Sequence, residues 1–227
     1  MKKNSRYRKR SRPIRNLKYP INLFCEGLQE EKYFCKIRDL INSQPNRDYD
    51  IELNVFNVGG GDASAVIEKA KQITIGSQNA TVVFDHDLKP NIFNNAIDEA
   101  KGLKFSIGYS ILNFDLWILL HKENPLNFSL GPKTKNSAYV SKIRKLYGLS
   151  KQDDIKSENI IKKIIAQIGF DQVNNAIICT KRIHNFNSKN HGSRVQKTPK
   201  NNVYYINPDL TIDQCIEKII KDTKKDV

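Results

Sequence analysis

The chain has 227 residues, of which 39% are apolar, so it can bury the core of one large domain or of a domain with an appended subdomain. It has no run of about 18 apolar residues and no apolar stretch behind its basic N-terminus, so the sequence predicts neither a membrane span nor a secretory signal. The formal net charge is +14, and four scattered cysteines without a CxxC pair are typical of reduced thiols in a cytoplasmic protein.

Residues 1–18 predict a basic, disordered tail. They contain nine Lys and Arg and no acid. The rest of the chain has the other 29 of the 38 Lys and Arg, against 24 Asp and Glu. A flexible basic arm is attracted to nucleic acid through counterion release. A solvated terminus that only aids solubility is the alternative interpretation. The candidate contacts to nucleic acid in this tail are Arg6, Arg8, Lys9, Arg10 and Arg12.

The next part of the chain, residues 19–113, alternates short apolar runs with segments of helical spacing. The runs predict strands at 20–25, 51–58, 81–84 and 105–112, and the segments between them predict helices at 30–41, 62–71 and 92–101. This alternation predicts an α/β fold with a parallel four-stranded sheet and right-handed crossovers.

Residues 114–227 predict a largely helical C-terminal region that packs on this core. Helical spacing is found at 114–121, 138–147, 155–168, 171–183 and from 211 onward, with a short strand at 203–206. Residues 184–202 have no apolar period and predict a long loop. Basic side chains between 181 and 200 are further candidates for contact with a nucleic-acid backbone, unless this loop orders only with a partner: Lys181, Arg182 and Arg194.

Three acids stand where strands are expected to end. Glu26 follows the first strand, and Asp85 and Asp87 follow the third. The carboxyl ends of parallel strands meet at one edge, and alternate residues of an extended segment point to the same side. The three carboxylates should therefore converge, and a hard cation such as Mg²⁺ or Mn²⁺ would offset their repulsion. Acids that only cap helices or form turns are the alternative.

Four ordered motifs resemble those of RloB-like proteins, whose fold looks like that of the Toprim superfamily. They are CEGLQEEKYF at 25–34, VVFDHD at 82–87, NFDLWILLH at 113–121 and NPDLT at 207–211. The chain departs from the family pattern at Gln29, where Thr is usual, and at Asp115, where Glu is usual.

The resemblance implies a Toprim-like, Rossmann-like sheet with a magnesium-dependent centre. It implies Glu26 as general acid/base or metal ligand, and Asp85 and Asp87 as metal ligands. Glu30 lies four residues after Glu26 and is a catalytic candidate or a ligand of a second metal, unless it only interacts with the helix dipole. His121 matches a family position and is a further catalytic candidate, with a buried structural histidine as the alternative.

The resemblance also implies a function in anti-phage abortive infection beside an AAA- or ABC-type ATPase. The chain has no GxxxxGK[ST] sequence, so any ATP hydrolysis by a P-loop mechanism would belong to that partner. We therefore expect a Mg²⁺-dependent nuclease that cleaves RNA, tRNA among the candidates, or DNA. The alternatives are a catalytically degenerate nucleic-acid-binding or regulatory subunit and a primase-like nucleotidyl transferase. The sequence leaves the oligomeric state and the number of metals open.

Overall fold

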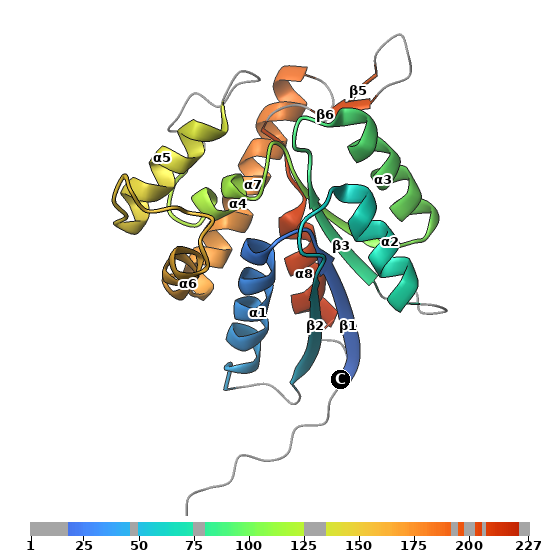
Figure 1. The fold of residues 1–227 in the computed structure, drawn as a ribbon, viewed down its shortest axis with the longest axis horizontal. Coiled ribbons are helices and arrows are strands. Elements are labelled where there is room, and N and C mark those ends of the chain that lie inside the picture. Colours follow the sequence, from blue (N-terminus) through green and yellow to red (C-terminus); the bar gives the residue numbers. More distant parts are fainter. Residues whose placement is uncertain are drawn as a thin grey trace, which may run out of the picture.

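A computed structural model describes residues 18–45, 50–74, 80–124, 135–191, 195–197, 203–205 and 208–222. Its centre is a four-stranded, all-parallel sheet with the order β2-β1-β3-β4 (Figure 1). This sheet and its helices confirm the predicted α/β, Rossmann-like fold class. The strands are β1 (Lys18–Cys25), β2 (Ile51–Asn57), β3 (Ala80–Asp85) and β4 (Ser106–Ser110).

Helices cover both faces of the sheet. The three helices of the α/β part are α1 (Leu28–Asn42), α2 (Ala63–Ile73) and α3 (Pro90–Gly102). Helices α2 and α3 pack with one apolar cluster that includes Phe24 and Val82, whereas α1 packs with a second cluster that includes Leu23 and Val83. Neighbouring residues of one strand therefore enter opposite cores, as the pleat of a strand requires.

The C-terminal region is mainly helical, as predicted. Its helices are α4 (Asp115–Leu120), α5 (Asn136–Tyr147), α6 (Glu158–Ala166), α7 (Phe170–His191) and α8 (Ile212–Asp222). They contribute to the larger apolar cluster, on the same face as α1. The chain also returns to the sheet: the amide of Ile111 donates to the carbonyl of Asp209 at 2.8 Å.

The prediction of a long loop at 184–202 is wrong for all of its described residues, which lie in a helix and a strand. Helix α7 continues to His191, and β5 (Val195–Lys197) pairs antiparallel with β6 (Val203–Tyr205). The helix has no apolar period here because polar side chains face inward. Nε2 of His184 lies 2.7 Å from the carbonyl oxygen of Leu210, and the amide of Asn187 donates to the carbonyl of Pro208 at 2.8 Å.

None of the helices in the described part of the chain combines the length and the apolar character needed to span a membrane.

Candidate metal centre

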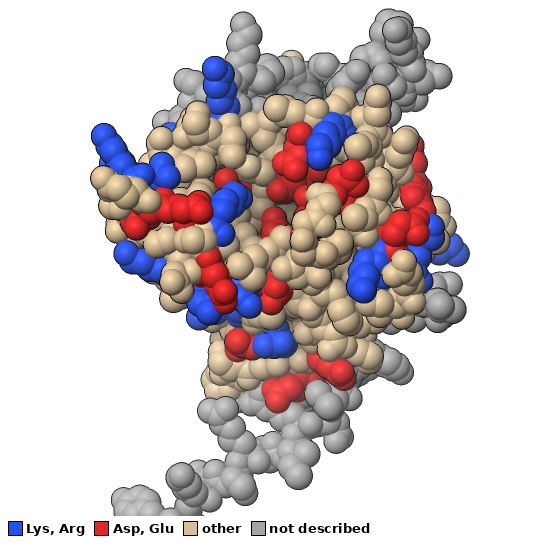
Figure 2. All heavy atoms as spheres, in the orientation of Figure 1, with Lys and Arg blue, Asp and Glu red and all other residues tan. Residues whose placement is uncertain are grey.

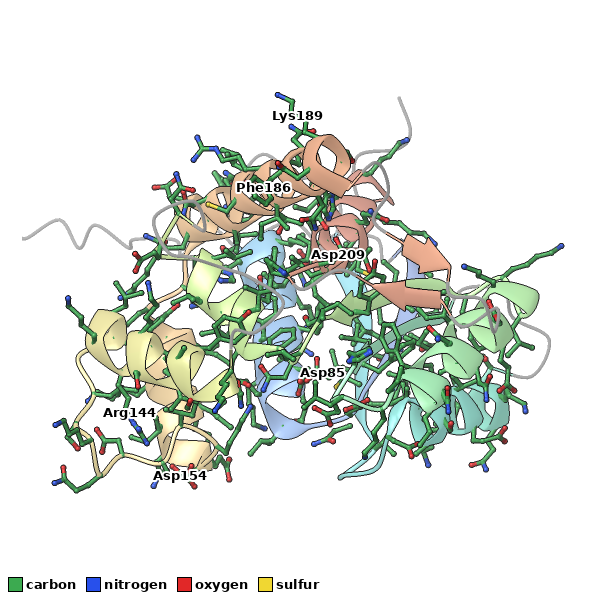
Figure 3. The ribbon with its side chains drawn as sticks, turned by 90° about the horizontal axis from the view of Figure 1, so that it is seen from above. Asp85, Arg144, Asp154, Phe186, Lys189 and Asp209 are labelled. Atoms are coloured by element: carbon green, nitrogen blue, oxygen red, sulfur yellow. The ribbon has the colours of Figure 1, made fainter. Side chains whose placement is uncertain are left out.

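The candidate metal centre lies at the point where the sheet reverses its strand order. From β1 the chain moves to β2 on one side, and it then returns to place β3 on the other side of β1. Ligands of open α/β sheets bind outside the carboxyl ends of the strands at such a point. Glu26 directly follows β1 and Asp85 ends β3, so both acids lie at this point. Figure 3 shows Asp85 near the middle of the molecule when it is viewed from above.

Hydrogen bonds from two backbone amides hold the carboxyl groups of Glu26 and Asp85. Oε1 of Glu26 accepts from the backbone amide of Asp85 at 3.2 Å, and Oδ2 of Asp85 accepts from the amide of Phe114 at 3.0 Å. The first bond ties the end of β1 to the end of β3. The second ties β3 to the start of α4, and the two carboxyl groups are thereby held at the same edge of the sheet.

Glu30 joins the cluster from the first turn of α1. It is only 7% exposed, and its carboxyl group folds back over Gly27. A Cβ atom on Gly27 would lie 3.0 Å from Oε2 of Glu30, whereas the backbone of Gly27 is extended with φ of −140°. Space for the Glu30 carboxyl, rather than backbone strain, is therefore the reason for glycine at this position.

The carboxyl groups of this cluster resist ionisation. Burial raises the pKa of Glu26 to about 8, and the charges of Asp87 and Glu30 add to the effect against the hydrogen bond from Asp85. Burial also raises the pKa of Asp85 well above its usual range, with further contributions from Glu30 and Glu26. Burial raises the pKa of Glu30 as well. Such a cluster favours binding of a cation, which would stabilise the ionised forms.

Asp87 reaches the cluster by a different geometry from the predicted one. Strand β3 ends at Asp85, and Asp87 lies in a turn with φ of 47°, so the expected extended alternation is wrong at this position. Asp87 is exposed, yet it lines a small pocket together with Glu26 and Asp85. The ring of His86, between the two aspartates, packs on Phe93 with 5.0 Å between centroids.

The chemistry of these donors fits a hard divalent cation, although the side chains do not form a ready-made cage. The pocket is lined by acids and one lysine among other residues: Glu26, Asp62, Asp85, Asp87 and Lys89. Carboxylate oxygens are the ligands that Mg²⁺ and Mn²⁺ prefer. Within the described ranges, no three His, Cys, Asp or Glu side chains are already arranged around a common metal position. The carboxyl groups would have to turn from their backbone donors toward an ion.

His121 lies in the core rather than in the carboxylate cluster. Its Nε2 is 3.1 Å from the hydroxyl of Tyr33, and its Nδ1 is 2.8 Å from the carbonyl oxygen of Trp117. Burial lowers the pKa of His121 to about 4, so the ring is neutral near pH 7. The neutral ring donates from Nδ1 and accepts at Nε2 from Tyr33. Both nitrogens are thus in use, and the ring connects α1 to α4.

Sequence reasoning missed Lys156, which lies in the connection between α5 and α6. Its ammonium is 3.2 Å from Oδ1 of Asp115 and donates to Oε1 of Gln29 at 3.1 Å. Burial of the ammonium lowers the pKa of Lys156, but the charges of Asp115 and Glu30 more than offset this and raise the pKa overall. Lys156 and Asp115 are 41 residues apart, so no local pattern pointed to their contact.

The predicted nucleic-acid contacts are mostly beyond the part of the chain that the structure describes. That applies to the five tail residues and to one residue of the later segment: Arg6, Arg8, Lys9, Arg10, Arg12 and Arg194. Lys181 and Arg182 are exposed on α7, and Lys181 pairs with Glu217 at 2.6 Å. On the face in Figure 2, acidic side chains gather around the centre, and basic side chains flank them on the side of α5 and α6.

The comparisons with known proteins support the family that the motifs suggested. The family model described as RloB-like protein matches residues 21–219, which includes the whole carboxylate cluster. The comparison with curated proteins finds no match, and neither does the comparison with solved structures. Because the matched range covers most of the chain, this protein belongs to the RloB-like family.

Proposed function

We propose that this protein is a metal-dependent nuclease whose centre is formed by Glu26, Asp85 and Asp87, with Mg²⁺ or Mn²⁺ as cofactor. The observation that carries the proposal is the meeting of Glu26 and Asp85 at the sheet's switch point, where both carboxyl groups have raised pKa values. Groups with such perturbed pKa values are concentrated at functional sites. The implied reaction is cleavage of a phosphodiester bond in RNA, tRNA among the candidates, or in DNA.

Glu26 is the best candidate for proton transfer. A carboxyl group with a pKa of about 8 holds a proton at neutral pH and can give it up when a cation or a substrate changes its surroundings. Its bond to the Asp85 amide fixes one oxygen of this carboxyl group at the edge of the sheet. A bound divalent ion would supply an activated water and offset the charge of the phosphate.

The proposed partners are nucleic acid and an ATPase. Lys and Arg of residues 1–18 would contact the nucleic-acid backbone, and the basic side chains beside α5 and α6 flank the acidic centre (Figure 2). An AAA- or ABC-type ATPase would supply ATP-dependent control in a cytoplasmic anti-phage defence complex, because the chain has no P-loop sequence of its own.

One observation favours a second candidate function, a nucleic-acid-binding or regulatory subunit with a degenerate centre. No three acids of the described residues are arranged to share a metal, and a centre that never closes around an ion would bind without cleaving. The first function requires the carboxyl groups of the cluster for cleavage, whereas the second involves binding of nucleic acid without cleavage.

A cleavage assay with matched variants tests the proposal. The purified chain and its cognate ATPase are incubated with end-labelled RNA and DNA in Mg²⁺ or Mn²⁺. We expect cleavage by the wild type and its loss in Glu26→Gln and Asp85→Asn. The control Asp98→Asn changes an exposed acid on α3 and should cleave normally. Intact RNA and DNA under all conditions would contradict the nuclease function, and full activity in both site variants would contradict the assigned centre.

The tail is tested separately by deleting residues 1–17, which leaves β1 intact. The deletion removes eight basic residues, so we expect lower affinity for nucleic acid and a shallower dependence of binding on salt. An unchanged salt slope would rule out phosphate contacts from the tail.

A further inference from the structure

The chain itself supplies a cation beside the carboxylate cluster. The ammonium of Lys156 lies 3.2 Å from Oδ1 of Asp115 and 3.1 Å from Oε1 of Gln29. Asp115 is fully buried, whereas the Lys156 side chain is 52% exposed. The stem of the lysine therefore runs along the surface, and its charged end enters from the solvent side.

Two buried polar atoms beside this ammonium have no partner within the described residues. They are Oδ2 of Asp115, in a residue that is 0% exposed, and Nε2 of Gln29, in a residue that is 4% exposed. A buried carboxylate oxygen without a hydrogen bond is unfavourable, and such atoms usually have a partner in native proteins. The spare oxygen of Asp115 therefore indicates a position where a cation can bind more completely than the ammonium does.

The acids of the cluster divide into two groups with different origins. Glu26, Asp85 and Asp87 come from the ends of β1 and β3 and line the pocket at the edge of the sheet. Glu30 and Asp115 come from the first turns of α1 and α4, and their charges raise the pKa of Lys156 together with a smaller contribution from Asp85. Among the described residues, no ion pair joins a lysine ammonium to an acid of the sheet group, whereas Asp115 of the helix group has such a partner.

We propose that the Lys156 ammonium occupies a second cation position, formed by Asp115 and Gln29, and so limits the centre to one divalent ion. This inference rests on the proposed metal function of the sheet group. Lysine suits the task because its ammonium is a compact charge on a flexible stem. The oxygens that it contacts, from Asp115 and Gln29, are also of the type that a divalent ion prefers. Removing the ammonium therefore leaves these oxygens, with the unpartnered Oδ2 of Asp115, as donors for a second ion.

Counting bound Mn²⁺ by equilibrium dialysis with electron paramagnetic resonance tests this inference without any measurement of activity. We expect one ion per chain in the wild type and two in Lys156→Met. The double variant Lys156→Met/Asp115→Asn should return to one, because it lacks the acid that holds the second ion. Lys156→Arg, which keeps the charge, and Lys151→Met, which removes an exposed charge from the same connection, should both bind one ion.

The outcomes separate this inference from the function on which it rests. Two ions in the wild type, or one in Lys156→Met, would overturn the inference and leave the metal function in place. No bound Mn²⁺ in either protein would overturn both. Lys156→Met is purified in Mn²⁺ throughout, so that the second ion can replace the missing charge. We expect Mn²⁺ to raise the Tm of Lys156→Met more than that of the wild type. A Lys156→Met protein that stays unfolded under saturating Mn²⁺ would also overturn the inference.

Discussion

Binding of a divalent ion to this protein should depend strongly on pH because Glu26 must lose a proton to act as a ligand. Its pKa is raised to about 8, first by burial and then by the charges of Asp87, Glu30 and Asp62. With that pKa, roughly one molecule in a hundred has an ionised Glu26 at about pH 6, and roughly one in ten at about pH 7. The ionisation of Glu26 alone should therefore make the apparent affinity for Mn²⁺ rise about tenfold per pH unit, or about 1.4 kcal/mol, and this contribution should level off above about pH 8.

The assay is a Mn²⁺ titration at several pH values between about 6 and 8, with the Glu26→Gln variant as the reference. Burial also raises the pKa values of Asp85 and Glu30, and these groups make the wild-type dependence steeper. The diagnostic quantity is thus the difference between the two proteins. Glu26→Gln should bind more weakly and with about one proton less released per ion. Equal slopes in both proteins, or a flat profile in the wild type, would refute the reasoning.

The protonation of Glu26 should also affect the folding stability of the metal-free protein. Because the folded pKa of Glu26 lies above its ordinary value of 4.5, its stabilising contribution is complete below about pH 4.5 and is lost as pH rises through about 8. This pKa shift corresponds to a change of at most about 5 kcal/mol in the free energy of unfolding. The change is smaller than this limit because water screens a partly exposed carboxyl group. Urea denaturation with a chelator should therefore give lower stability at pH 8 than at pH 5 in the wild type, and a smaller difference in Glu26→Gln.

Two further substitutions probe the supports of the centre. Gly27→Ala places a Cβ atom 3.0 Å from Oε2 of Glu30, so we expect about tenfold weaker Mn²⁺ binding with a change in folding stability of under about 1 kcal/mol. Gly102→Ala, which meets nothing within 4 Å, is the matched control, and equal Mn²⁺ affinities in the two variants would contradict the role of Gly27. Tyr33→Phe leaves Nε2 of His121 without its donor and should lower the free energy of unfolding by about 1–3 kcal/mol in urea denaturation. Unchanged stability would mean that this hydrogen bond contributes nothing.

The sheet and two of the three acids of the centre were predictable because their signals are local. Apolar runs that end at an acid indicate both a buried strand and the edge at which it stops, which placed Glu26 and Asp85 together. The prediction for Asp87 was wrong in its geometry because extended alternation was assumed to continue beyond the last hydrogen-bonded residue of β3, where the chain turns instead.

The remaining errors and omissions have a common physical cause, namely contacts between residues far apart in sequence. Helix α7 was predicted too short because His184 and Asn187 bond to carbonyl groups of the segment that follows β6, so its inward face is not apolar. Lys156 was missed because nothing near it in the sequence distinguishes it from the exposed lysines around it. Only the fold brings it to Asp115 and Gln29.

The connection between α5 and α6 links the outer side of the C-terminal region to the charge of the centre, because it contains Lys156. Lys156 lies in the connection between two helices that are placed to one side of the sheet (Figure 1). Its ammonium nevertheless lies 3.2 Å from Oδ1 of Asp115. An outward movement of this connection by the length of one hydrogen bond would break the contact between the ammonium and Asp115 and weaken the compensation of the acids' charge. Control of the centre by a partner therefore requires no access to its edge of the sheet.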